Sequence, residues 1–427
     1  MKTAEIQTDL ITPLGAYLRL RERGPSFLLE SVEKGRLGRH SLVGWGSEVV
    51  SFEEAESRLA LGSPVVGYLG YDYMAKLEPI PLPINGPDLP ESRFVAADSL
   101  LRFDHVTGVA EVLAGNRDEI AGLLAGPGGS GGVANPGYER RDQRGTQSPR
   151  SDGSGPGAVQ RFPSREAYEE SVRRAKEHIR EGDAYQIVVS QRAERRTERS
   201  AVELYRSLRR INPSPYLFLL ELDGLSLIGS SPETLVKLEG RRASVNPIAG
   251  TAGVDKGDLE RLLASEKDRA EHVMLVDLGR NDLSRVCLPG SVKVERFLQP
   301  ERYSHVTHLV SEVAGQVRSD VRPLDVLLAC FPAGTVSGAP KVRAMQIISE
   351  LEGYRRGPYA GAVGYALPGG DLDTCIAIRM IVLSDGLARL QAGAGIVADS
   401  DPTAEHEECL AKLAALEAAI DDAEGRR

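Results

Sequence analysis

Residues 216–231 read "YLFLLELDGLSLIGSS", and this stretch decides the fold class. Two runs of β-forming apolar residues flank Asp223-Gly224, a dipeptide that suits the tight turn of a β-hairpin because both turn positions need positive φ. Residues 234–245 ("TLVKLEGRRASV") repeat the arrangement around Gly240. Strands joined by hairpins are antiparallel, so the stretch predicts antiparallel sheets rather than a doubly wound parallel sheet.

Segments with helical periodicity are interspersed with these strands. In residues 163–185 ("PSREAYEESVRRAKEHIREGDAY") Ser164 can cap a helix, apolar residues recur at helical spacing, and Gly182 can end the helix. The same criteria predict further helices over residues 259–283, 340–354 and about 402–419, and further strands over residues 185–192, 291–299, 360–368, 373–386 and 387–398. This arrangement indicates the α+β class.

The composition is that of a globular protein, with 41% apolar residues, 26% charged residues and a net charge of -9 over 427 residues. Because an acidic chain repels phosphate backbones, we expect no nucleic-acid partner. The start lacks the features of a signal peptide, and no stretch approaches the roughly 18 apolar residues of a membrane span, so we expect a cytoplasmic chain without a membrane partner. The four cysteines are far apart and are expected to be buried free thiols: Cys287, Cys330, Cys375 and Cys409.

Residues 126–160 are rich in glycine, proline and serine and hold few residues that could anchor a core. Such a segment cannot offset the entropy lost on ordering it, so we predict a disordered linker here. This linker separates an N-terminal region, residues 1–125, from a longer region, residues 161–427.

Two glycine-rich motifs resemble nucleotide-binding loops but lack the required context. In "PAGTVSGAPK" (residues 332–341) three residues rather than four separate Gly334 from Gly338, and Val342 follows the lysine where Ser or Thr is required. In "GAGIVA" (residues 393–398) no helix begins within the motif, as a dinucleotide site requires. Neither motif therefore predicts a nucleotide ligand.

The loop at residues 332–341 is still suited to an anion. Pro340 fits the first position of a helix, which would leave free N–H groups near residues 337–339 at a positive helix end, beside the Thr335 hydroxyl and the Lys341 ammonium. A carboxylate would fit there as well as a phosphate. The alternative is a turn that only caps the helix.

Two pairs of carboxylates are spaced one helical turn apart: Asp268 with Glu271, and Glu405 with Glu408. Each pair could simply face solvent or complement a helix dipole. If the pairs converge, carboxylates about 4 Å apart repel by roughly 4 kcal/mol at an effective dielectric of about 20, which calls for a cation or for protonation. Oxygen ligands alone favour Mg²⁺.

Four further polar residues are candidates for chemistry. Glu233 follows a predicted strand, where a partly buried carboxyl can have a raised pKa and act as a general acid, or can cap a turn. His308 lies in an apolar run and is either catalytic or a core histidine. Arg379 interrupts a predicted strand, which favours a ligand or a buried ion pair over a solvated face. Tyr359, in "GPYAG", is the fourth.

Six motifs in order resemble those of chorismate-using enzymes: "NPSPY" (212–216), "GSSPE" (229–233), "PIAGT" (247–251), "EHVMLVDLGRNDL" (271–283), "PAGTVSGAPKVRAM" (332–345) and "QAGAGIVADSDP" (391–402). Within that family the chain resembles the large subunit of anthranilate synthase over nearly everything after Arg161, and "GYLGYDY" near the N-terminus also resembles it. The resemblance implies a layered α/β/β/α fold with mainly antiparallel sheets and an N-terminal region packed on it.

The resemblance also implies roles for the matching residues. Glu271 and Glu408 match Mg²⁺ ligands, with Asp268 and Glu405 beside them. The positions implied to bind chorismate are Gly250, Thr251, Tyr359, Arg379, Gly393, Ala394 and Gly395, with Lys341 added from the loop. Glu233 and His308 match residues assigned to proton transfer, and Thr335 joins this catalytic set from the loop beside the substrate.

The implied activity is the conversion of chorismate and ammonia to anthranilate and pyruvate, the first step of tryptophan biosynthesis. No cysteine lies in the turn typical of glutamine amidotransferases, so ammonia from glutamine would need an amidotransferase small subunit in a hetero-oligomer. Aminodeoxychorismate synthase and isochorismate or salicylate synthase are the alternatives. Ala249 disfavours aminodeoxychorismate synthase, which typically has a lysine at this position. Gln186 disfavours isochorismate and salicylate synthases, which typically have a lysine there.

Tryptophan is the implied feedback inhibitor. Ser31, Pro213, Ser214 and Pro215 match the tryptophan site of the large subunit, although the same residues could simply form a turn before a strand. A tryptophan-binding protein without chorismate turnover is therefore a second class of function. After Thr251 the sequence lacks the Arg/Pro/Gly stretch usual in the family, which leaves this edge of the site open.

Overall fold

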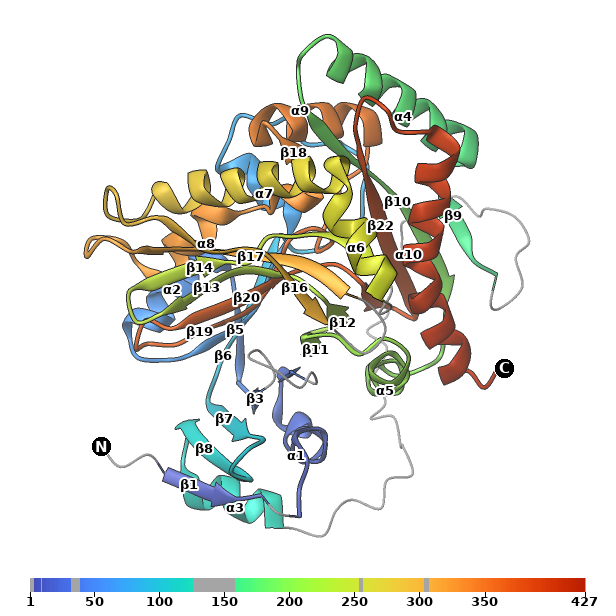
Figure 1. Cartoon of the computed structure of the whole chain (residues 1–427). Coiled ribbons are helices and arrows are strands. Elements are labelled where there is room, and N and C mark those ends of the chain that lie inside the picture. The colour runs from blue at the N-terminus through green and yellow to red at the C-terminus, as the bar shows by residue number, and fades with distance from the viewer. Residues whose placement is uncertain are drawn as a thin grey trace.

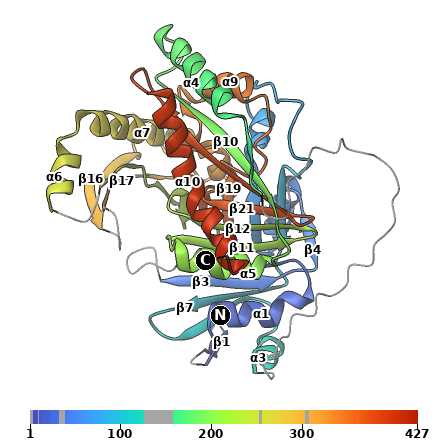
Figure 2. The ribbon, with the colours of Figure 1, turned by 90° about the vertical axis from the view of Figure 1, so that its right-hand side faces the viewer.

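Two large antiparallel sheets lie face to face, and helices cover the outer face of each sheet (Figures 1 and 2). The computed structural model describes residues 4–8, 10–31, 39–125, 158–252, 256–302 and 307–426. Every pair of neighbouring strands in these sheets is antiparallel, from the pairing of β1 (Ala4–Gln7) with β8 (Val109–Ala114) onward. The expected α+β class with α/β/β/α layers is confirmed.

The quoted stretch forms the centre of the first sheet. As predicted, β11 (Tyr216–Leu222) and β12 (Leu225–Ser231) form a hairpin in which Leu222 lies opposite Leu225. Asp223 and Gly224 turn the chain with φ angles of 38° and 83°, as such a turn requires. The sheet has the strand order β1-β8-β7-β3-β2-β11-β12-β21-β22-β10-β18, with β9 paired to β10. Its other strands are β2 (Ser26–Glu30), β3 (His40–Trp45), β7 (Ser99–Asp104), β9 (Gln160–Phe162), β10 (Gln186–Arg196), β18 (Gly338–Ala339), β21 (Met380–Ser384) and β22 (Leu387–Ile396).

The second sheet has the strand order β15-β17-β14-β13-β20-β19-β5-β6-β4, with β16 paired to β17. Its strands are β4 (Glu48–Val50), β5 (Val65–Leu69), β6 (Ser92–Ala96), β13 (Thr234–Glu239), β14 (Arg242–Val245), β15 (Ile248–Ala252), β16 (Lys293–Arg302), β17 (Thr307–Gln316), β19 (Ala362–Ala366) and β20 (Leu372–Ile376). The N-terminal region adds strands to both sheets, because β2 pairs with β11 and β5 pairs with β19.

Helices bury the two outer faces. The outer face of the first sheet packs against α1 (Pro13–Leu20), α3 (Arg117–Ala125), α5 (Ala201–Ile211) and α10 (Pro402–Ala423). The second sheet packs against α2 (Phe52–Ala60), α7 (Glu266–Ser284) and α8 (Pro323–Cys330). The end of the first sheet formed by β10 and β22 packs against α4 (Arg165–Arg180) and α9 (Lys341–Glu352). The remaining helices are α6 (Lys256–Ala264) and the 3₁₀ turns η1 (Arg21–Arg23), η2 (Tyr71–Lys76) and η3 (Gly334–Val336).

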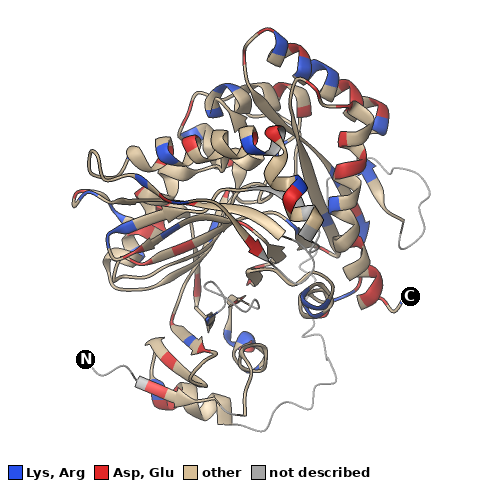
Figure 3. Ribbon diagram, viewed as in Figure 1, with Lys and Arg blue, Asp and Glu red and all other residues tan. Residues whose placement is uncertain are grey.

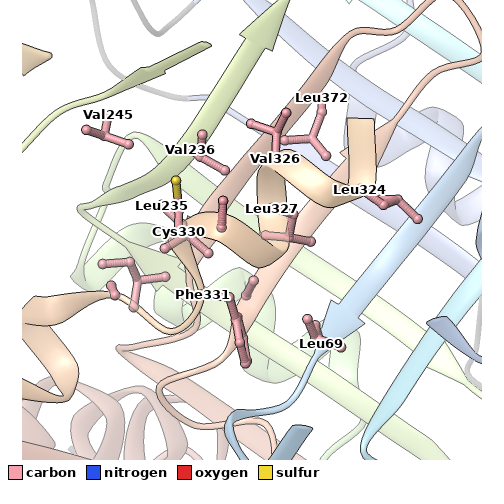
Figure 4. Close-up of a cluster of buried hydrophobic side chains, with 14 of the residues drawn as sticks. Leu69, Leu235, Val236, Val245, Leu324, Val326, Leu327, Cys330, Phe331 and Leu372 are labelled. Atoms are coloured by element: carbon pink, nitrogen blue, oxygen red, sulfur yellow. The ribbon is translucent and has the colours of Figure 1, made fainter. Parts of the chain in front are cut away.

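Apolar side chains fill the space between these layers. Phe27 and Phe218 from the first sheet meet Tyr68 from the second in a core cluster that lies between the sheets. Leu327 and Phe331 pack α8 and the residue after it onto the second sheet (Figure 4). Charged residues of both signs lie along the outer helix α4 (Figure 3).

Three segments differ from their predicted boundaries. The linker predicted over residues 126–160 ends before Gln160, because Gln160 begins β9. Residues 126–157 lie outside the described residues. The helix predicted over residues 259–283 is two helices, because Ser265 closes the last turn of α6 through its N–H to Leu262 O (3.3 Å) and opens α7 by accepting from Arg269 N–H (3.1 Å).

The prediction of a single strand over residues 373–386 is wrong, because two strands, β20 and β21, occupy this stretch. The chain leaves the second sheet at the end of β20 and enters the first sheet at β21. Arg379, with a φ of 52°, lies in this crossing. Both strands are largely buried, so one continuous apolar run contains no sign of the change of sheet.

All four cysteines are buried free thiols, as expected. None of the described helices combines the length and the hydropathy that a membrane span needs.

Leu327→Ala should lower the free energy of unfolding by about 3 kcal/mol, because a buried leucine leaves a cavity in a packed core. Leu10→Ala, at a fully exposed leucine, is the matched control and should change stability by less than about 0.5 kcal/mol. Urea unfolding followed by circular dichroism measures both. Equal effects of the two substitutions would contradict the packing of α8.

Candidate active site

Glu233 and Thr335 meet at a pocket between the second sheet and α7. Glu233 lies between β12 and β13, and its Oε1 accepts a hydrogen bond of 3.0 Å from the Thr335 hydroxyl in η3. The pocket has an empty volume of about 400 Å³ and is lined also by Asn246 before β15 and by Gly279 and Asp282 of α7. Two of the predicted catalytic residues, distant in sequence, are therefore in direct contact.

Burial raises the pKa of Glu233 to about 7, while the hydrogen bond from Thr335 and the charges of Lys412 and Arg379 act to lower it. This agrees with the raised pKa expected from the sequence. Near neutral pH both protonation states are populated, which suits a group that donates or accepts a proton in a reaction.

Glycines on one face of β22 make room for two side chains. Gly393 and Gly395 point to the same face of the strand. A Cβ atom at Gly393 would lie 3.1 Å from the Tyr359 hydroxyl oxygen, and one at Gly395 would lie 2.5 Å from Gln186 Nε2. Ala394 points to the opposite face, into the core beneath α4 and α9. The predicted substrate contact of Ala394 therefore falls to its backbone, because strand alternation turns its methyl group away.

Glu271 and Glu408 both reach β22 through one intermediate residue. Gln186 Nε2 donates to Glu271 Oε1 at 3.0 Å and packs on Gly395, as noted above. Lys412 Nζ is 2.6 Å from Glu408 Oε1 and donates to Gly393 O at 2.7 Å. The two carboxylates, on α7 and α10, are thus linked to the same strand at positions two residues apart.

The described residues do not gather the predicted carboxylates into a closed metal site. The side chain of Asp268 lies outside them. Among the described side chains, the one group of three or more possible ligands close enough to share an ion is His178, Glu181 and Asp183 at the end of α4, and Asp183 already accepts from Arg343 at 2.6 Å. The shared ion at Glu271, Glu405 and Glu408 stays a prediction.

The donor set near Glu271 nevertheless fits a hard cation. Glu271 and Glu408 offer carboxylate oxygens, the ligands that Mg²⁺ prefers. Gln186 is buried, and its Oε1 atom has no hydrogen-bond partner in the part of the chain that the structure describes. A buried amide oxygen without a donor is costly, and a cation or a cation-bound water would satisfy it.

Arg379 lies within electrostatic reach of the carboxylates on both sides of the site. Burial lowers the pKa of its guanidinium, and Tyr359, Glu408 and Glu233 act in the opposite direction. Its carbonyl accepts from Ser230 N–H at 3.0 Å, which holds the crossing between the sheets. The interpretation of Arg379 as a ligand or ion-pair residue, rather than a solvated one, agrees with this position.

His308 lies on β17 and is partly buried. Its register partner on β15 is Thr251. The structure thus places the implied proton-transfer residue opposite the implied chorismate-binding strand. The side chains of residues 249–252, which include Gly250 and Thr251, lie outside the described residues, so their contacts stay predictions.

The loop at residues 332–341 departs from the predicted anion cradle at Ser337 and Pro340. Ser337 N–H donates to Gly334 O at 3.2 Å, and Ser337 O accepts from Val188 N–H at 2.9 Å. Pro340 is the N-cap of α9 rather than its first residue. The N–H of Ser337 is therefore not free, because it donates within the loop, and the carbonyl of Ser337 joins the loop to β10.

Lys341 forms a buried ion pair instead of facing the loop. Its Nζ atom lies 2.8 Å from Asp282 Oδ2 and 3.3 Å from Cys330 O, and the side chains of Lys341 and Asp282 are 10% and 8% exposed. The sequence did not point to Asp282 as the partner of this ammonium, and the predicted substrate contact of Lys341 stays a prediction. The glycine of the loop serves packing: a Cβ atom at Gly334 would lie 1.8 Å from Leu278 Cδ2 of α7.

The residues predicted to bind tryptophan are brought together by the pairing of β2 with β11. Glu30 lies opposite Leu217, so Ser31 follows β2 beside the turn that contains Ser214 and Pro215. Ser214 and Pro215 are buried and Pro213 is exposed. Among the described residues, the buried Ser31 hydroxyl has no hydrogen-bond partner. A buried polar group without a partner is suited to meet a ligand.

Lys412, whose ammonium links Glu408 to the carbonyl of Gly393, was not among the residues predicted from the sequence. A signal existed, because Glu408 and Lys412 are four residues apart in a predicted helix, where opposite charges meet.

Comparisons with known proteins show the family to which this chain belongs. A family model described as chorismate binding enzyme matches residues 23–418, and the chain belongs to this family. It is 40% identical to anthranilate synthase component 1 of Acetivibrio thermocellus, over 99% of this chain and 95% of that protein, and 42% identical to the protein of the same name from Thermus thermophilus, over 97% and 96%. The crystal structure of anthranilate synthase component I from Streptococcus pneumoniae aligns with a TM-score of 0.76 and 32% identity, over 96% of this chain and 98% of that one.

Glu233→Gln should be more stable than the wild type at pH 8, but not at pH 4. Since the folded-state pKa of Glu233 is about 7 against an ordinary value of 4.5, the wild-type chain loses stability as the pH rises through this window. Gln has no charge to bury, so its advantage in unfolding free energy over the wild type should grow by up to about 3 kcal/mol between the two pH values. Urea unfolding at both pH values measures this, and a constant difference would contradict the raised pKa.

Proposed function

We propose that this chain converts chorismate and ammonia to anthranilate and pyruvate. The observation that carries the proposal is the contact of Glu233, a carboxyl with a pKa of about 7, with Thr335, within electrostatic reach of Arg379. The names of the Acetivibrio and Thermus relatives support the same activity. This reaction is the first step of tryptophan biosynthesis, and we propose that the chain carries it out in the cytoplasm.

The proposed role of Glu233 is to protonate the 4-hydroxyl of the substrate, which leaves as water while ammonia adds at C2. The C2 proton is then removed and the enolpyruvyl ether at C3 departs as pyruvate, which leaves the aromatic ring. His308, on β17, is proposed to assist this second step. A carboxyl titrating near neutral pH suits the first step, because it holds a proton yet gives it up readily.

Binding of the substrate is proposed to use the face of β22 that Gly393 and Gly395 leave open. Arg379 would pair with a substrate carboxylate, and Tyr359 would bound the site beside Gly393. Gly250 and Thr251 would close it from β15. Ala394 would contribute only its backbone.

Mg²⁺ is the proposed cofactor, held by Glu271 and Glu408 with Asp268 and Glu405 beside them. When bound, such an ion anchors a substrate carboxylate and stabilises developing negative charge. Gln186 donates to Glu271 and would hold the Glu271 carboxylate in place for the ion. Its Oε1 atom has no hydrogen-bond partner among the described residues.

The nitrogen source is proposed to be an amidotransferase small subunit in a hetero-oligomer, with free ammonium as a substitute. Gln186 favours ammonia over water as the nucleophile, because its amide is no base to activate water. Formation of isochorismate or 4-amino-4-deoxychorismate is the competing activity within the family.

Feedback inhibition by tryptophan is proposed to act at Ser31 and residues 213–215. The unpartnered buried hydroxyl of Ser31 next to this turn supports a ligand there.

The test is an assay of the purified chain with chorismate, Mg²⁺ and ammonium, followed by anthranilate fluorescence. Glu271→Gln should lower Mg²⁺-dependent turnover by roughly 100-fold and abolish the thermal stabilisation produced by Mg²⁺ alone. Glu407→Gln, at an exposed carboxylate of α10, is the control and should change neither value. Accumulation of isochorismate or 4-amino-4-deoxychorismate would reassign the activity, and full activity of Glu271→Gln would remove the metal assignment.

Ser31→Ala should weaken tryptophan binding by about 10-fold, as expected when a hydrogen bond to a charged ligand is lost, while uninhibited turnover with ammonium stays unchanged. Isothermal titration calorimetry measures the binding. Ser47→Ala, at an exposed serine, should leave the affinity as it is. Unchanged binding by Ser31→Ala would place the inhibitor elsewhere.

A further inference from the structure

A buried guanidinium lies at the point where three substrate-contacting segments of the proposed site meet. Arg356 follows α9, and its side chain is 1% exposed. Its Nε and Nη2 atoms donate to the two oxygens of Glu352, at 2.9 and 2.6 Å. Arg356 was not a candidate from the sequence, and neither the motifs nor the proposed chemistry above uses it.

The remaining donors of Arg356 hold two backbone carbonyls. Nη1 donates to Val336 O at 2.7 Å, and Nη2 donates to Val188 O at 2.8 Å. Val336 directly follows Thr335, which holds Glu233. Val188 is the register partner of Gly395 on β22. One planar group therefore fixes the distance between the loop that positions the proposed acid and the strand that lines the substrate face.

The same guanidinium also positions the turn that contains Tyr359. Its carbon lies 4.5 Å from the ring centre of Tyr71 and 5.8 Å from that of Tyr359. The turn is anchored from the N-terminal region, because Asp72 accepts from the backbone N–H groups of Arg356 (3.2 Å) and Gly357 (2.8 Å). Tyr359 then reaches the space beside Gly393.

Glu352 fixes the other end of this arrangement. Its Oε1 atom accepts from the N–H and the hydroxyl of Ser190 on β10, at 2.8 and 2.7 Å, as well as from Arg356. Ser190 is the register partner of Gly393. The ion pair is thus bound to the residues opposite both glycines of β22. A buried ion pair contributes little net stability but requires one geometry, because each unmatched donor or acceptor is costly.

We propose that Arg356, held by Glu352, is a positioning residue for the reaction: it sets Thr335, Tyr359 and the β10–β22 face in one arrangement around the substrate. This inference rests on the proposed function. Arg356 touches neither Glu233 nor the proposed substrate contacts of β22 directly, so its effect on the reaction passes through the segments that it holds.

Lysine cannot replace this group. Arg356→Lys retains the positive charge opposite Glu352, but an ammonium on a flexible stem cannot hold the carboxylate and both carbonyls in one plane. We expect kcat/KM for chorismate to fall at least 10-fold. Arg195→Lys is the matched control: Arg195 is also buried, 3% exposed, and pairs with Asp421 (2.7 Å) and Glu424 of α10, away from the proposed substrate face. Its kcat/KM should stay within twofold of the wild type.

The pH profile separates positioning from general damage. The Thr335 hydroxyl lowers the pKa of Glu233, as do the charges of Lys412 on α10 and Arg379 between the sheets; Asp282 of α7 lines the same pocket. If Arg356→Lys loosens η3, the hydrogen bond weakens and the pKa of Glu233 rises. The alkaline limb of kcat/KM, where the general acid loses its proton, should then shift to higher pH, as it should in Thr335→Val.

The outcomes are distinct. The proposal is supported if Arg356→Lys and Thr335→Val both lower kcat/KM and both shift the alkaline limb to higher pH. Arg195→Lys should leave the alkaline limb where it is. A twofold or smaller effect of Arg356→Lys, or a loss of activity without a shifted limb, overturns it. Should Arg356→Lys fail to fold, Glu352→Asp, which shortens the partner by one methylene, is expected to give the same shift and overturns the proposal if it does not. A wild-type chain that forms no anthranilate would reject the proposed function instead.

Discussion

The packing of two antiparallel sheets against each other is the constraint on which this molecule depends. Each sheet contributes one face to the core cluster in which Phe27, Tyr68 and Phe218 meet. Because that face is committed, helices must cover the other face of each sheet, and the layers follow. The hairpin at residues 216–231 sits at the middle of the first sheet and sets its antiparallel order.

The candidate site lies where chain segments cross between these layers. Glu233 lies between the end of β12 in the first sheet and the start of β13 in the second, and Arg379 lies where the chain crosses back. Residues at such crossings are not held by strand pairing on both sides. Single backbone hydrogen bonds hold these crossings, from Ser230 N–H to Arg379 O and from Ile376 N–H to Glu233 O, and the side chain of Glu233 depends on its contact with Thr335.

Much of the fold could be predicted from the sequence, because local patterns decide it. The hairpin followed from Asp223-Gly224, and the helix after Ser164 followed from its cap and periodicity, with Ser164 accepting from Ala167 N–H as expected. The crossing at Arg379 could not be predicted, since a strand buried in either sheet has the same apolar pattern.

The sequence predicted members of the candidate site but not the contacts between them. Motif resemblance named Glu233 and Thr335, yet their hydrogen bond joins residues about one hundred positions apart, and no local pattern shows it. The same limit applies to the ion pair of Lys341. The spacing of the loop placed an ammonium near its turn, whereas the nearest carboxylate, Asp282, comes from a helix that precedes it by 59 residues.

The interleaving of the N-terminal strands with the rest of the chain has a consequence for biosynthesis. Strand β5 pairs with β19, so its Gly67 waits for Gly364, which is made almost three hundred residues later. At about 5–20 residues per second, this edge stays unpaired for tens of seconds on the ribosome. Until β19 has been made, the backbone N–H and C=O groups along this edge of β5 have no native partner.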